Sequence, residues 1–181
     1  QGGDKIGIIG PNGCGKTTML RLLMGGDTDY EGYLKLGAWV KYAYLGQEIT
    51  FPDEGLTIAQ HLMNEGGFTR REALAQAGRY GFYGDICDKP IAVLSGGEKV
   101  RLTLCCLLMQ KPTCLILDEP TNHLAMVSRD VLMHAVDEYG GTVIAVTHDR
   151  YFLDRCVDRI FAFEDYGVKV WEGNYEDYKK G

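Results

Sequence analysis

The chain has 181 residues, a formal net charge of −6 and 45% hydrophobic residues. This length and composition fit one domain with a buried core, and no apolar run approaches the roughly 20 residues that span a bilayer. The negative charge argues against a domain that binds nucleic acid over its whole surface. Six cysteines without metal-ligand spacing indicate reduced thiols, so we expect a cytoplasmic protein without disulfides.

Strand and helix signals alternate in the first half of the chain. A β-rich run from Lys5 to Ile9 leads through a glycine-rich turn into a predicted helix from Thr17 to Met24. Aromatic and apolar residues with some alternation predict strands from Tyr33 to Leu36 and from Val40 to Leu45. The pattern from Thr57 to about Tyr80 is helical.

Two serine or threonine residues mark helix starts further along the chain. Thr69 with Glu72 and Ser95 with Glu98 each have the spacing of a capping box. Apolar residues after Ser95 recur at helical spacing, so we expect them to form one buried helical face: Val100, Leu104, Leu107 and Leu108.

The second half of the chain predicts a parallel sheet. Continuous apolar runs from Thr113 to Leu117 and from Thr142 to Thr147 are typical of strands buried on both faces. A helix from Val127 to Tyr139 separates them, and a hairpin follows from Arg159 to Trp171, with its turn near Asp165 to Gly167. This order predicts an α/β fold with a largely parallel sheet.

The first turn of the chain has the sequence GPNGCGKT and satisfies the pattern G-x-x-x-x-G-K-[ST] between a strand and a helix. Such a loop turns its backbone N–H groups around phosphate oxygens, while the helix start adds a positive dipole end. Lys16 would reach the β- and γ-phosphates, and the Thr17 hydroxyl would bind Mg²⁺. The predicted phosphate-binding residues are Gly10, Pro11, Asn12, Gly13, Cys14, Gly15, Lys16, Thr17 and Thr18.

Two acidic residues stand where the first buried strand ends. In open α/β sheets, ligands bind at the carboxyl ends of the strands. Because successive residues near a strand end point in different directions, Asp118 can hold Mg²⁺ while Glu119 polarises an attacking water. Alone, such a pair is more often a solvated turn, but together with the glycine-rich loop it indicates a nucleotide-hydrolysing site.

Two further polar residues follow strands. His148 comes just after the second buried strand, where it could contact a γ-phosphate and orient the water. Gln47 follows the strand that ends at Leu45, and its neutral amide could contact Mg²⁺ or the water. On its own Gln47 is weak evidence, since a glutamine after a strand is usually just exposed.

The helix cap at Ser95 contains two glycines that capping does not require. Gly96 and Gly97 would let a phosphate approach the helix start closely. Since the chain already has one phosphate loop, that phosphate would belong to another copy, which predicts two domains packed head to tail with twofold symmetry.

These motifs, GPNGCGKTT, Gln47, LSGGE, LILDEP and His148, resemble those of an ATP-binding-cassette (ABC) nucleotide-binding domain in order and approximate spacing. The segments DEPTNHL, THDRYFLD and WEGNYEDY are similar to the F subfamily, ABC-F. The resemblance implies an ATPase of the P-loop type with ATP and Mg²⁺ as cofactors, a second cassette as partner, and action on the ribosome in translation or antibiotic resistance.

The resemblance also implies a role for each matching residue. The Mg²⁺ contacts would be Thr17, Gln47 and Asp118, the general base Glu119 and the switch histidine His148. Ser95, Gly96, Gly97 and Glu98 would form a signature that acts on the partner's nucleotide. Residues 1–181 would form one cassette domain, with a small helical subdomain at about 55–97.

The sequence departs from the family pattern in ways that leave alternatives open. The N-terminal β-subdomain is missing, Ala125 stands where an aspartate is usual, and Cys105-Cys106 replaces a common Ala-Arg pair. The chain would therefore be a piece of a longer protein. The alternatives are the cytosolic ATPase subunit of a membrane transporter and a nucleotide-binding module without turnover.

Overall fold

The computed structural model describes residues 2–26, 31, 36–164 and 167–180. These residues divide into two compact units. The first comprises Gln1–Tyr44, Pro112–Pro120 and Gly140–Gly181, and the second comprises Leu45–Lys111 and Thr121–Tyr139. Among the described residues, no helix is long and apolar enough to cross a membrane, and no two cysteines are joined by a disulfide.

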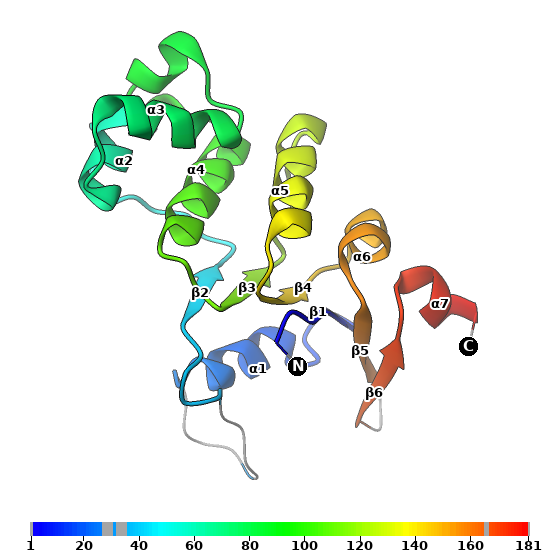
Figure 1. The fold of residues 1–181 in the computed structure, drawn as a ribbon. Coiled ribbons are helices and arrows are strands. Elements are labelled where there is room, and N and C mark those ends of the chain that lie inside the picture. The colour runs from blue at the N-terminus through cyan, green and yellow to red at the C-terminus, as the bar shows by residue number, and fades with distance from the viewer. Residues whose placement is uncertain (1, 27–30, 32–35, 165–166, 181) are drawn as a thin grey trace. The chain divides into compact units, whose positions relative to one another are not determined.

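The first unit is built on a sheet that has six strands within the described residues, in the order β2-β3-β4-β1-β5-β6 (Figure 1). Parallel ladders join β3 to β4, β4 to β1 and β1 to β5, and β6 runs antiparallel to β5. The strands are β1 Lys5–Ile9, β2 Tyr42–Leu45, β3 Cys114–Asp118, β4 Thr142–Val146, β5 Arg159–Glu164 and β6 Gly167–Glu172. The predicted α/β fold with a largely parallel sheet is confirmed.

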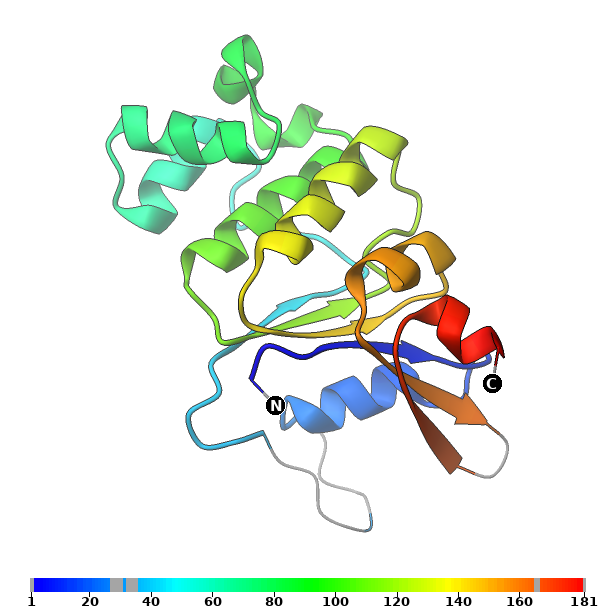
Figure 2. The ribbon, with the colours of Figure 1, turned by 45° about the vertical axis from the view of Figure 1, so that its right-hand side comes forward.

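Helices cover both faces of this sheet. The helix α1 (Lys16–Leu23) lies on one face, and α6 (Arg150–Cys156) and α7 (Tyr175–Lys180) lie on the other (Figure 2). On the α1 side, Leu20 packs into an apolar cluster with Ile8 and Ile116. On the α6 side, a Cβ atom at Gly7 of β1 would come within 2.5 Å of the Leu153 side chain, so the helix needs a glycine beneath it.

The second unit is helical. Its elements are α2 Ile58–Gly66, α3 Arg70–Arg79, the 3-10 helices η1 Gly84–Asp88 and η2 Ile91–Val93, α4 Gly96–Met109 and α5 Met126–Glu138. Apolar side chains from α2, α3 and α4 share one core, which includes Leu62, Ala77 and Leu102. The predicted capping boxes at Thr69 and Ser95 are present.

One predicted strand lies mostly outside the described residues, and the buried face of α4 differs from the prediction. The strand predicted from Tyr33 to Leu36 lies outside the described residues except for Leu36, as do residues 165 and 166 of the predicted turn. The expected buried face of α4 was only partly right, because Val100, Leu107 and Leu108 are half-buried. The buried residues are Arg101, Leu102, Leu104 and Cys105. The reason is that α4 packs against α2 and α3 as well as α5, which moves the buried stripe around the helix.

Candidate nucleotide-binding site

The loop between β1 and α1 has a backbone that only glycine adopts easily. Gly15, the N-cap of α1, is left-handed with φ 97°. Gly10 has φ 153°, and a Cβ atom there would lie 2.7 Å from the Cβ of Phe163. The motif glycines are therefore required by the loop itself, whose shape lets backbone N–H groups face an anion.

Lys16 closes this loop with its own side chain. The residue is 7% exposed, and its Nζ donates to the carbonyl oxygens of Gly10 at 2.8 Å and Pro11 at 2.7 Å. The ammonium group is thus held over the loop by two acceptors. An anion that enters the loop would find the charge already in place.

Oxygen ligands suited to a hard cation meet at the end of β3. Asp118 is buried, and its Oδ1 lies 3.4 Å from the hydroxyl of Thr17. The hydroxyl of Tyr44 donates to Asp118 Oδ2 at 3.3 Å. Burial raises the pKa of Tyr44 above its usual value, and the negative charge of Asp118 adds to that shift. Sequence reasoning missed Tyr44, although it alternates with Tyr42 on the strand that ends beside Asp118.

Glu119 sits in a strained turn directly after β3. Its φ is 51°, which is uncommon for a residue other than glycine, and its N–H donates to the carbonyl of Val146 at 2.7 Å. Strain of this kind clusters at functional sites. The bond to β4 fixes the direction in which the Glu119 side chain leaves the sheet.

His148 faces the Glu119 carboxylate. Its Nε2 lies 3.4 Å from Glu119 Oε1, and its backbone N–H donates to Oε2 at 3.4 Å. Burial raises the pKa of Glu119 above its ordinary value, with a smaller contribution of the same sign from Asp118, while His148 and Lys16 oppose it. A carboxyl group with a raised pKa is a better proton acceptor near neutral pH.

The first unit thus brings together Lys16, Thr17, Asp118, Glu119 and His148. The other predicted site residues, Gln47 and the segment from Ser95 to Glu98, belong to the second unit. Gln47 is exposed in a bend after β2. The Ser95 hydroxyl donates to Glu98 Oε2 at 2.8 Å, and the Glu98 carboxylate also accepts the Ser95 N–H.

The two glycines after Ser95 have different surroundings. A Cβ atom at Gly96 would meet nothing within 4 Å. At Gly97 it would lie 2.7 Å from the Oγ and 3.1 Å from the Cβ of Ser128, a buried residue of α5. Gly97 is therefore required for the close approach of α4 to α5, whereas only Gly96 lacks a packing reason.

This difference predicts opposite effects on stability. We expect Gly97→Ala to reduce the free energy of unfolding by about 1–3 kcal/mol, the usual cost of overpacking. Gly96→Ala is expected to be neutral or slightly stabilising, because alanine favours the helix. Urea unfolding of both variants tests this. Ser128→Ala should recover part of the loss in Gly97→Ala, and equal stability of the two alanine variants would contradict the packing role.

Ala125 is the N-cap of α5 and provides no capping side chain. Aspartate, the residue that the family pattern has here, is among the best N-cap residues. The departure noted in the sequence therefore leaves this helix start without the usual acceptor for its first N–H groups.

A family model described as ABC transporter matches residues 1–122. The chain belongs to the ATP-binding-cassette family. It is 40% identical over 176 residues to ABC transporter F family member 2 of Arabidopsis thaliana, a match that covers 96% of this chain and 26% of that protein. The predicted resemblance to an ABC-F cassette is thereby confirmed, and the chain is identified as an ATPase domain of the P-loop type.

Solved structures agree on the fold of the ABC domain. The archaeal ribosome recycling factor aABCE1, in complex with the ribosomal stalk protein aP1, gives a TM-score of 0.77 at 27% identity over 99% of this chain and 36% of that chain. An ATP-binding subunit of an ABC transporter gives 0.77 at 20% identity over 99% of this chain and 82% of that chain. The ABC chain described here spans about a quarter of the length of its first curated relatives.

Proposed function

We propose that the chain binds ATP with Mg²⁺ and hydrolyses it as one cassette of a soluble, cytoplasmic ABC-F-type protein. The observation that carries this proposal is the pairing of Glu119 with His148 beside the loop that holds Lys16. Glu119 would accept a proton from the attacking water, and His148 would orient that water and contact the γ-phosphate. The Lys16 ammonium has three donors, so it would keep its bonds to the loop and donate a further N–H to a phosphate oxygen.

The donor set at the end of β3 fits a magnesium ion. In ATP sites, Mg²⁺ usually takes one or two protein oxygens and completes its octahedron with water and phosphate. Thr17 and Asp118 supply two such oxygens 3.4 Å apart. Water and the phosphates of the nucleotide would complete the coordination of the ion. We assign Gln47 as a further contact of the ion or of the water.

ABC cassettes work as pairs, and we propose that the Ser95 cap acts on the nucleotide of a second cassette. The capping box presents the Ser95 hydroxyl and the N–H groups of Gly96 and Gly97 at the start of α4. Gly96 supports this role because the space around it is open. Residues 55–97 would form the helical subdomain of a single cassette domain, which is supported by their membership of one compact unit.

We further propose that ATP-driven closure acts on the ribosome, in translation or antibiotic resistance. The support is the similarity to ABC-F members and to a ribosome recycling factor. The main alternatives are the ATPase subunit of a transporter, and a module that binds nucleotide without turnover. The proposal of ribosome contact rests on this similarity and not on charge, because the net charge of the chain is −6 and RNA is itself negatively charged.

Two measurements test the proposal. ATPase activity per molecule should rise steeply with protein concentration, because each site needs a second cassette. A chain that binds a fluorescent ATP analogue but shows no turnover at any concentration would be the binding module. Co-sedimentation in ATP with ribosomes supports the ABC-F function, and co-sedimentation with membrane vesicles alone would favour the transporter subunit.

A further inference from the structure

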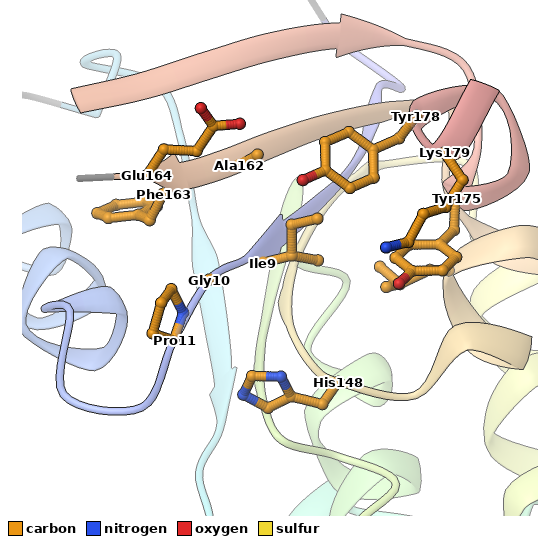
Figure 3. Close-up of a pocket in the computed structure, with 11 residues that line it drawn as sticks. Ile9, Gly10, Pro11, His148, Ala162, Phe163, Glu164, Tyr175, Tyr178 and Lys179 are labelled. Atoms are coloured by element: carbon orange, nitrogen blue, oxygen red, sulfur yellow. The ribbon is translucent and has the colours of Figure 1, made fainter. Parts of the chain in front are cut away.

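The side chain of His148 has little packing around it. It is 49% exposed, and its Nε2 contacts the Glu119 carboxylate. His148 also lines a cavity of about 650 Å³, together with Pro11 and with Tyr175 and Tyr178 of α7 (Figure 3). Because the side chain is half-exposed and borders this cavity, its position depends largely on the backbone that carries it.

That backbone leads directly into α6. Asp149 caps the helix, with its Oδ1 accepting the N–H groups of Tyr151 at 3.0 Å and Phe152 at 3.3 Å. Leu153, one helical turn further on, packs closely over Gly7 of β1. The orientation of α6 therefore sets the place of His148 at its start.

The start of the C-terminal helix α7 contacts α6 at two places. One turn into α6, Asp154 Oδ1 accepts the N–H of Glu176 at 2.7 Å, and the Asp154 carbonyl accepts the Asn174 amide at 3.4 Å. At the end near His148, the Arg150 guanidinium lies over the ring of Tyr175, 5.7 Å from its centroid. Lys179 Nζ lies over the same ring, 5.6 Å from its centroid. Arg150 is two residues from His148, so its contact with Tyr175 acts on the turn that carries the histidine.

We propose that Tyr175 is a positioning residue for His148, acting through Arg150 and the first turn of α6. This inference rests on the proposed role of His148 in hydrolysis. Tyr175 does not touch the reacting groups. Its ring holds the cation that follows the histidine, so that the imidazole stays 3.4 Å from the Glu119 carboxylate.

The test compares Tyr175→Leu with Tyr175→Phe in the 181-residue chain. Phenylalanine keeps the ring face that attracts the guanidinium, and leucine removes it. An exposed cation–π contact corresponds to about a two- to fivefold change in rate, so Tyr175→Leu should lower kcat about two- to fivefold with KM for ATP unchanged. Tyr175→Phe should restore most of the rate. Equal losses in both variants, or a change in KM alone, would overturn the proposal.

Two further arms separate positioning from general instability. In a His148→Ala background, Tyr175→Leu should cause no additional loss of kcat, whereas an additive loss contradicts action through His148. By NMR, the imidazole resonances of His148 should move in Tyr175→Leu and stay in place in Tyr175→Phe. The NMR measurement reports on the position of His148 even if the wild-type chain has no turnover. Absence of turnover would refute the proposed function and not the positioning role. If Tyr175→Leu does not fold, Arg150→Gln removes the same cation–π contact by changing its exposed partner.

Discussion

Glu119→Gln is expected to keep ATP binding and to lose turnover by at least about a hundredfold, the usual contribution of a positioned general base. Glutamine has nearly the same shape as glutamate, but it cannot accept the proton of the attacking water. The variant should also accumulate as a closed dimer with ATP, because closure no longer leads to hydrolysis. Single-turnover ATPase assays and size-exclusion chromatography with ATP measure both effects.

The same variant provides its own folding control. Since burial raises the pKa of Glu119, the folded state favours the protonated carboxyl, and ionisation near neutral pH reduces stability. Glutamine carries no charge, so Glu119→Gln should melt at an equal or higher temperature than the wild type near pH 7. This advantage is lost in acid, where the wild-type carboxyl is protonated in both states. Unchanged turnover in Glu119→Gln would remove Glu119 from its role. Glu138→Gln, at an exposed position of α5, is the matched control.

Lys16→Ala is expected to weaken ATP binding roughly 10- to 100-fold, because one or two charged hydrogen bonds to phosphate oxygens are lost. The substitution also removes the donor for the carbonyls of Gly10 and Pro11. Lys16→Met keeps most of the side-chain volume without the charge, so it separates the loss of phosphate contacts from the loss of packing. Titration with a fluorescent ATP analogue gives the Kd of each variant.

The ATP affinities of the two Lys16 variants separate the role of the charge from that of the side-chain volume. If the methionine and alanine variants lose affinity equally, the charge is responsible. If methionine binds ATP as the wild type does, Lys16 serves the shape of the loop and not the phosphate. Lys111→Ala, at an exposed lysine after α4, controls for the change in net charge.

Local patterns predicted most of the secondary structure, because several elements end at glycines and several helices begin at capping residues, and both signals act within a few residues of sequence. The strand from Lys5 to Ile9 has the predicted bounds. The helix predicted from Val127 to Tyr139 differs by one residue at each end. The sequence also predicted that Glu119 and His148 would both act on the attacking water, and they lie 3.4 Å apart because they follow the neighbouring parallel strands β3 and β4.

Features that depend on distant parts of the chain were not predicted. The packing of Gly97 against Ser128 is one such feature, because Ser128 is buried and lies 31 positions later in the chain. Arg101 was absent from the expected buried face of α4, yet its guanidinium donates to the carbonyl of Tyr80 at 2.9 Å and lies over the Phe82 ring. Sequence periodicity counts such a residue as polar and cannot show that tertiary partners offset part of the cost of burying it.

The two bonds from Lys16 to its own loop have a consequence for the speed of nucleotide capture. A loop whose shape is already fixed by internal bonds loses little conformational entropy when a ligand arrives. Association is then limited by diffusion and orientation, and not by a slow ordering step. Stopped-flow traces of nucleotide association should accordingly be single-exponential, with an observed rate that rises linearly with ATP concentration.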